Sequence, residues 1–266
     1  MKRARLFLLL IVAAVTLIPH PSYGRIRKTR PPASSNVYPG AAPPSPWAVF
    51  APLVLSVGVE YESDREQTQY EFPISLEYNL TQKLKLILEP TYVSIVSKSA
   101  DASSVNGFGD LEAAVDYEFL SERRYRPALA VEGRIKWPTA EDPDLGEPGN
   151  DYTFGIIASK DLVYLDVDLN ILYTFVGDRE KEDEVEVSFA TEWHVNRYVD
   201  LIAEVSNVMR TKSPRDASIE SRNEIEATLG LGWQINKNFR LEHGVVLKEH
   251  GEWELVFSCE WNFGGD

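Results

Sequence analysis

Cysteine, methionine and histidine are scarce in this chain of 266 residues, which contains one cysteine, two methionines and four histidines. The single thiol, Cys259, cannot close an intramolecular disulfide or build a metal site from several thiolates. Basic residues are also few: 27 Lys and Arg stand against 41 Asp and Glu, and the formal net charge is -14 at pH 7. Because a phosphate backbone requires a basic face, this balance excludes a nucleic-acid partner.

Long apolar runs are absent after the first part of the chain. There, an apolar run over 6–18 follows three basic residues, and Ser22 and Gly24 supply the small residues of a cleavage point. This order is typical of a secretory signal peptide, and the run is too short for a transmembrane helix. We therefore predict a signal peptide over 1–24 and an exported protein without a helical anchor. Its removal takes away three basic and no acidic residues, so the net charge falls from -14 to -17.

The segment 25–50 is basic at its start and then rich in proline. Such a composition favours an extended chain over a packed core. We predict a periplasmic linker here, with no partner of its own.

From Leu53 onward, apolar and polar residues alternate for about ten positions at a time. In one such segment the apolar face holds Tyr70, Phe72, Ile74 and Leu76. A period of two predicts strands, and about twelve segments of this kind follow one another with none left over for a helix. Short turns, such as 81–83 and 236–238, alternate with connections that are mostly longer, such as 98–106 and 138–150. We predict an all-β fold over 51–266: a closed antiparallel up-and-down transmembrane β-barrel of about twelve strands.

The face opposite the apolar one is rich in carboxylates, and this decides which face is inside. A Lys or Arg on the lipid side of a barrel costs roughly 2–4 kcal/mol at mid-depth, and Asp or Glu costs less. The charged face therefore has to be the lumen, and the aromatic residues near the strand ends form the girdles of an outer-membrane barrel. The candidate lumen-lining selectivity residues are Glu77, Glu89, Asp110, Glu112, Asp116, Glu132, Arg134, Asp166, Asp168, Glu186, Glu192, Glu204, Glu224, Glu226, Arg240, Glu242 and Glu254.

Closure of the barrel should pair the strand near Leu55 with the strand near Phe257. The last segment alternates aromatic and apolar residues from Trp253 to Phe263, and it resembles the terminal signal by which the outer-membrane assembly machinery recognises barrels. Three residues, Gly264 to Asp266, extend beyond the final aromatic residue, which departs from the usual ending.

Several stretches resemble the bacterial outer-membrane family of the MetA pathway of phenol degradation, also described as transporter-like barrels. They are Gly107-Phe108-Gly109-Asp110-Leu111 leading to Tyr117-Glu118-Phe119-Leu120, Arg126-Pro127-Ala128-Leu129-Ala130 leading to Lys136-Trp137-Pro138-Thr139, and Ala158-Ser159-Lys160-Asp161-Leu162 leading to Tyr173-Thr174-Phe175-Val176-Gly177. The glycine that usually follows the second stretch in that family is replaced here by Ala140. The resemblance implies an outer-membrane channel or uptake protein for hydrophobic or aromatic compounds, and it supplies no catalytic residues.

Two interpretations of the lumen remain open at this point. Carboxylates along a narrow wet path would favour cations, because low-dielectric walls focus the electric field. Alternatively, they pair with cations in cross-strand ladders that merely fill a plugged interior. The candidate partners in that case are Lys85, Arg134, Lys136, Arg222 and Arg240.

Catalysis is not predicted. His243 falls on the lipid-facing side, as in lipid-facing barrel enzymes with a Ser-His-Asn site, but its expected neighbours are Leu231 and Phe257 rather than a serine or asparagine. The acidic loop 141–151 does not match the spacing of a calcium loop, so neither a metal site nor a cofactor is expected.

We therefore expect an outer-membrane channel for passive uptake of small molecules, with cations or neutral and aromatic solutes preferred. A non-conducting structural barrel or a lipid-modifying enzyme is the alternative. The expected partners are outer-membrane lipid, lipopolysaccharide bridged to the acidic loops through divalent cations, and the barrel-assembly machinery during biogenesis.

Overall fold

The structure is a computed structural model that describes residues 53–63, 67–97, 104–178, 181–210, 223–249 and 252–263. Within these ranges the chain forms twelve strands, each hydrogen-bonded in antiparallel orientation to its neighbours in sequence. They are β1 (Leu53–Ser63), β2 (Gln67–Asn79), β3 (Leu84–Ser97), β4 (Ser104–Leu120), β5 (Ala128–Trp137), β6 (Asp151–Asp161), β7 (Leu165–Phe175), β8 (Glu184–Asn196), β9 (Val199–Arg210), β10 (Glu224–Asn236), β11 (Phe239–Lys248) and β12 (Trp253–Phe263).

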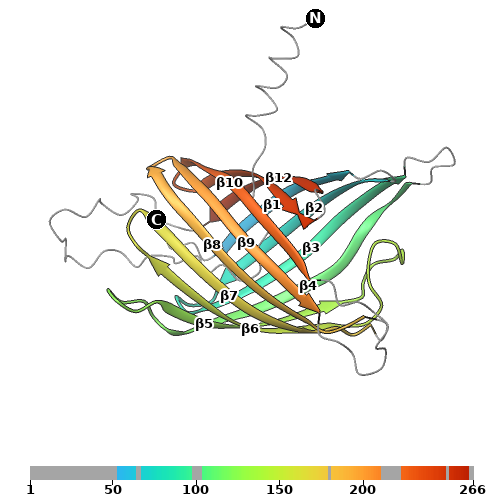
Figure 1. Ribbon diagram of the computed structural model, residues 1–266, viewed down its shortest axis with the longest axis horizontal. Coiled ribbons are helices and arrows are strands. Elements are labelled where there is room, and N and C mark those ends of the chain that lie inside the picture. The colour runs from blue at the N-terminus through green and yellow to red at the C-terminus, as the bar shows by residue number, and fades with distance from the viewer. Residues whose placement is uncertain are drawn as a thin grey trace, which may run out of the picture.

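The sheet closes into a barrel because β1 also pairs with β12 (Figure 1). In this pairing Leu55 lies opposite Trp261 and Val59 lies opposite Phe257, which confirms the predicted closure. The predicted fold class, including the strand number, is also confirmed. The predicted signal peptide 1–24 and linker 25–50 lie outside the described residues. No helix in the described ranges is long and apolar enough to cross a membrane.

Strand β6 illustrates why the barrel carries its apolar residues outside. Its even-numbered side chains Tyr152, Phe154 and Ile156 are 44%, 57% and 55% exposed, whereas the odd-numbered Thr153 and Ile157 are buried. In a soluble barrel the apolar residues would fill the centre instead. The same outward exposure of large apolar side chains recurs on every strand, so the lipid-facing surface predicted from the alternation is present.

The short connections lie where the alternation placed them, and local side-chain bonds stabilise two of them. Asn196 Oδ1 accepts a hydrogen bond from the Tyr198 amide at 2.8 Å, and Asn236 Oδ1 accepts one from the Asn238 amide at 2.9 Å. Asparagine forms such turns because its short side chain reaches the backbone two residues ahead. Barrels of this kind turn briefly at the periplasmic end and carry their longer loops outside.

Strand β4 differs from the prediction at its start. The segment 98–106 was expected to be a loop, but β4 begins at Ser104 and continues for 17 residues. Two residues separate Phe108 from Leu111 in β4, whereas only one residue separates their partners Tyr92 and Pro90 in β3. Strand β4 therefore has a β-bulge at this point. Because a bulge changes which side chains face inward, it re-aims the residues beside it.

Candidate functional site: the lumen of the barrel

The barrel encloses a cavity of about 560 Å³ lined by residues of β1 to β5, of β7 to β12 and of the loop between β5 and β6. Among the described residues on its wall, fourteen are carboxylates and four are cations. The cations are Lys85, Arg134, Lys136 and Lys248. The carboxylates are Glu60, Glu62, Glu71, Glu77, Glu89, Asp110, Glu112, Glu147, Asp168, Glu204, Glu226, Glu242, Glu254 and Glu260.

Several carboxylates stand directly opposite one another on neighbouring strands, with a cation between them. Glu89 of β3 and Glu112 of β4 are register partners, and Arg134 Nη1 lies 2.5 Å from the first and 3.0 Å from the second. Glu62 of β1 and Glu254 of β12 are likewise partners, and Lys248 Nζ contacts them at 2.8 and 3.1 Å. Like charges directly opposite each other destabilise a sheet. Each cation therefore relieves a repulsion that the register itself creates.

Further contacts in the barrel wall also join one cation to several carboxylates. Arg134 Nε also donates to Glu132 at 3.0 Å. Lys85 Nζ lies 3.4 Å from Glu77 and 3.1 Å from Asp116, so it joins β2, β3 and β4. In each case one cation serves two or three carboxylates.

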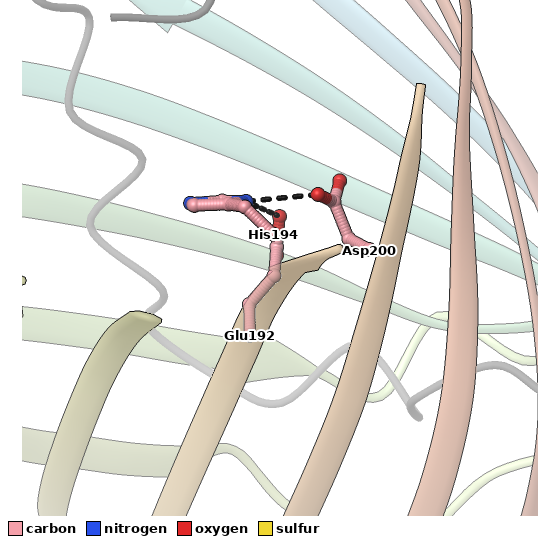
Figure 2. A group of neighbouring side chains, drawn as sticks. All are labelled: Glu192, His194 and Asp200. Carbon is pink, nitrogen blue, oxygen red and sulfur yellow. Dashed lines mark hydrogen bonds and ion pairs between the residues drawn. The ribbon is translucent and has the colours of Figure 1, made fainter. Parts of the chain in front are cut away.

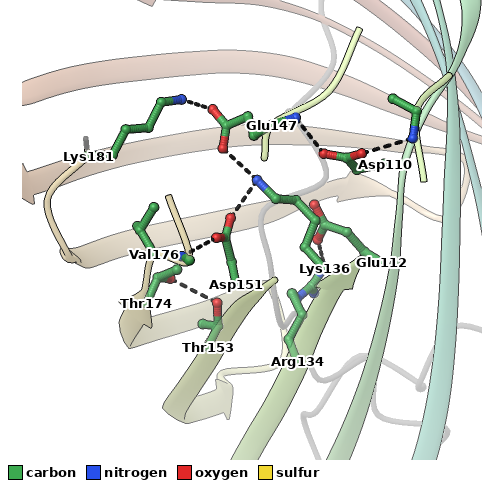
Figure 3. A network of polar contacts seen from close by, with 12 residues as sticks. Asp110, Glu112, Arg134, Lys136, Glu147, Asp151, Thr153, Thr174, Val176 and Lys181 are labelled. Atoms are coloured by element: carbon green, nitrogen blue, oxygen red, sulfur yellow. Dashed lines mark hydrogen bonds and ion pairs between the residues drawn. The ribbon is translucent and has the colours of Figure 1, made fainter. Parts of the chain in front are cut away.

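The loop 138–150 turns into the barrel and joins this network (Figure 3). Lys136 Nζ lies between Glu147 of the loop, at 2.7 Å, and Asp151 at the start of β6, at 2.5 Å. Lys181, from the connection between β7 and β8, contacts Glu147 from the other side. Burial tends to raise the pKa of the Glu147 carboxyl, but hydrogen bonds and positive charge from the two lysines outweigh it and hold the pKa below its ordinary value of 4.5. Glu147 is therefore ionised at neutral pH.

A second cluster lies near the short-turn end of the barrel and contains Glu192, His194 and Asp200 (Figure 2). His194 Nδ1 lies 2.8 Å from Asp200 Oδ1, and His194 Nε2 lies 3.3 Å from Asp166. These residue types could hold a metal ion, but Arg240 Nη1 already lies 3.0 Å from Glu192 and 2.9 Å from Asp200. A guanidinium at this place repels a second cation, so the cluster fits an internal ion-pair network rather than a metal centre.

Ten of the predicted selectivity residues lie on the cavity wall. They are Glu77, Glu89, Asp110, Glu112, Arg134, Asp168, Glu204, Glu226, Glu242 and Glu254.

The other seven predicted residues lie outside the cavity wall. Asp116 and Glu132 are packed between β3, β4 and β5, and Asp166, Glu192 and Arg240 belong to the cluster around His194. Glu186 of β8 lies opposite Leu172 of β7, and Glu224 of β10 contacts Arg210 at 2.7 Å.

Strand alternation does not reveal all of the lining. Leu145, Gly146 and Glu147 come from a loop, where a period of two carries no information about direction. Ile87, Val93 and Val256 are apolar residues that face inward, although the inward face was expected to be polar. In β3 the residues Leu86 to Leu88 are all apolar, so their sequence does not indicate which side chains face the lumen.

His243 has the neighbours predicted for it, Leu231 on β10 and Phe257 on β12. Its Nε2 accepts a hydrogen bond from the Trp233 indole at 3.0 Å, and its buried Nδ1 has no hydrogen-bond partner among the described residues. A catalytic histidine needs one ring nitrogen on the nucleophile and the other on an orienting acid. Neither contact is made here, so no nucleophilic site is assembled around His243 within the described part of the chain.

A family model described as "Putative MetA-pathway of phenol degradation" matches residues 74–248. The COG4313 outer membrane channel from Pseudomonas putida F1 superimposes with a TM-score of 0.66 at 15% identity, covering 85% of this chain and 100% of that one. The KdgM porin in complex with disordered oligogalacturonate has a TM-score of 0.55 at 10% identity, covering 79% and 99%.

The NanC porin has a TM-score of 0.54 at 11% identity, covering 79% of this chain and 100% of that one. No curated protein matches the sequence. At these identities the likeness to solved structures establishes the fold, which is that of outer-membrane channels and porins.

Proposed function

The chain belongs to the family described as the putative MetA pathway of phenol degradation, and from its lumen we propose that it is a passive outer-membrane channel for small molecules, selective for cations over anions. Neutral solutes, including aromatic ones, are proposed to pass as well. The observation that carries this proposal is the excess of carboxylates over cations on the wall of the cavity.

Ion pairing does not remove the negative charge of the lumen. Lys248 contacts Glu62 and Glu254, so this group of three keeps a net charge of -1 when all are ionised. On the cavity wall, Arg134 contacts Glu89 and Glu112, and this group likewise keeps a net charge of -1 when all three are ionised. In a water-filled path with low-dielectric walls, such a charge concentrates cations and repels anions.

Uncharged solutes are supported by a different part of the lining. Pro73, Ile87, Val93, Leu145 and Val256 present apolar surface to the same cavity. A solute with an apolar body can leave water along this surface, which lowers its transfer cost.

The proposed membrane partners follow from the ends of the barrel. In the loop 138–150, Glu147 turns into the lumen, whereas Glu141 and Asp144 are exposed, and we propose that divalent cations bridge these exposed carboxylates to lipopolysaccharide. Along its length, β12 presents Trp253, Phe257, Trp261 and Phe263 on its outer face, and we propose that the barrel-assembly machinery binds this strand during biogenesis.

Planar-bilayer recording on the purified chain tests whether the cavity conducts. The proposal expects discrete current steps well above those of the bilayer alone. A barrel that inserts, resists unfolding in detergent and yet passes no current would be a structural barrel. Phospholipid hydrolysis that disappears in the variant His243→Ala would favour the enzyme and contradict the proposal.

A further inference from the structure

The loop between β5 and β6 reaches the lumen through an anchor on β4. Asp110 Oδ1 accepts hydrogen bonds from the amides of Thr139 at 3.0 Å and Ala140 at 3.1 Å, and Asp110 Oδ2 accepts one from the amide of Glu147 at 2.8 Å. In return, the Leu111 amide donates to Thr139 Oγ1 at 2.9 Å. One carboxylate therefore holds both ends of the inward turn. Hydrogen bonds to an ionised acceptor are among the stronger ones in proteins.

Two glycines of β4 leave the space into which the loop fits. A Cβ atom at Gly107 would stand 3.0 Å from Leu145 Cδ1, and one at Gly109 would stand 3.0 Å from the Leu145 carbonyl oxygen. A Cβ at Gly146 would stand 2.5 Å from Asp110 Oδ1 and from Ala140 Cβ. The stretch Gly107-Phe108-Gly109-Asp110, which the sequence alone marked only as a strand feature, thus provides both the space and the anchor.

The bulge in β4 explains why this short stretch can do both. The extra residue between Phe108 and Leu111 breaks the alternation. Gly109 is therefore packed against the loop, and Asp110 faces the lumen beside it, while Phe108 remains 60% exposed on the lipid side. Bulges often re-aim a side chain at a functional position.

The tip of the loop reaches the cavity wall. Leu145, Gly146 and Glu147 line the cavity, and Glu147 is contacted by Lys136 of β5 and Lys181 of the neighbouring connection. The loop is thus tied to three parts of the barrel: β4 through Asp110, β5 through Lys136, and the connection between β7 and β8 through Lys181.

From these contacts we infer that the loop 138–147 is the constriction of the channel, that Asp110 and Gly146 position it, and that Leu145 and Glu147 set the size and charge of what passes. This inference rests on the proposed channel function. It assigns a role in transport to a loop that the family resemblance leaves undefined.

Two substitutions should release the loop by different means. Asp110→Asn replaces an acceptor oxygen with an amide that cannot accept all three hydrogen bonds. Gly146→Ala places a methyl group where Asp110 Oδ1 and Ala140 Cβ now lie. In planar bilayers, both variants are expected to conduct more than the wild-type chain and to lose part of its cation preference. The matched controls are Glu252→Gln, which neutralises an exposed carboxyl outside the cavity wall, and Gly133→Ala, because a Cβ at Gly133 meets nothing within 4 Å.

The outcomes separate this inference from the proposed function. If the wild-type chain does not conduct, the channel itself is disproved. If the wild-type chain conducts and the folded variants Asp110→Asn and Gly146→Ala match it in conductance and selectivity, the channel stands and the constriction is rejected.

A labelling experiment provides a test that does not require release of the loop. Leu145→Cys in a Cys259→Ser background places a single thiol on the cavity wall. Modification by a small cationic methanethiosulfonate should then reduce the current, and the Cys259→Ser chain alone should show no change. A current that persists after complete modification of this thiol would overturn the inference even if the released variants fail to fold.

Discussion

Arg134 and Glu89 lie on strands two places apart in the barrel, and the Arg134 Nη1 atom is 2.5 Å from Glu89 Oε2. The contact passes over β4, where Glu112 lies 3.0 Å from the same nitrogen. The guanidinium side chain is only 4% exposed, so these charges interact with little solvent screening. The integrity of the wall at this point therefore depends on one cation.

Replacement of Arg134 tests that dependence. Arg134→Gln leaves Glu89, Glu112 and Glu132 without their shared partner, and removal of one member of a buried ion pair typically costs about 3–5 kcal/mol. We expect a loss of that order in the free energy of unfolding, measured by urea titration in lipid vesicles. The double variant Arg134→Gln/Glu89→Gln should recover part of the loss. The exposed turn variant Arg123→Gln should behave as the wild-type chain, and an equal loss there would contradict the assignment.

The loop ion pairs predict a specific dependence on pH. Because the pKa of Glu147 in the folded chain lies below its ordinary value of 4.5, its contacts stabilise the fold above that value, and the contribution is lost as the pH falls through the folded pKa. The stability difference between the wild-type chain and Glu147→Gln should therefore be present at pH 7 and vanish in strong acid. A difference that grows as the pH falls would show that the sign is wrong. Urea midpoints measured across this range provide the comparison.

Glu226 offers a way to change the lumen charge without exposing a buried cation. It lines the cavity, and Lys248 opposite it on β11 contacts Glu62 and Glu254 instead. Glu226→Gln should lower the cation preference and leave thermal stability unchanged. The matched control is Glu252→Gln, in an exposed position between β11 and β12 outside the cavity wall, which should change neither quantity. Equal selectivity in both variants would remove Glu226 from the conduction path.

The lipid-facing surface predicts a depth-dependent cost. Ile156 lies at the middle of β6 and is 55% exposed, so Ile156→Lys should destabilise the membrane-inserted barrel by roughly 2–4 kcal/mol. Tyr164 is equally exposed, but it lies in the turn between β6 and β7, where the same change should cost about 0–1 kcal/mol. Urea titration in vesicles measures both. Equal costs at the two positions would argue against a membrane boundary between them.

Much of the barrel could be predicted from the sequence because one physical rule governs it. A strand with lipid on one side and water on the other must alternate, and along β6 the residues Tyr152 to Ile156 do so. The same rule identified ten residues of the cavity wall. The rule does not hold where inward-facing residues are apolar, as Ile87 and Val256 are. It also does not apply to the loop around Glu147, because a loop has no strand periodicity.

Ion-pair geometry could not be predicted either. Which carboxylate a lysine contacts depends on register and on three-dimensional reach, as Lys248 illustrates by contacting Glu62, 186 residues away, rather than its register partner Glu226. The anchoring of the loop by Asp110 depends on a bulge of a single residue. Neither feature leaves a signal in residue type or spacing.

We propose that the carboxylates of the cavity wall face a conducting path and select cations. The most direct test is the reversal potential of the purified chain in a planar bilayer under a gradient of potassium chloride. A potential close to that of a potassium-selective membrane is predicted. A potential of the opposite sign, which shows chloride preference, would contradict the account.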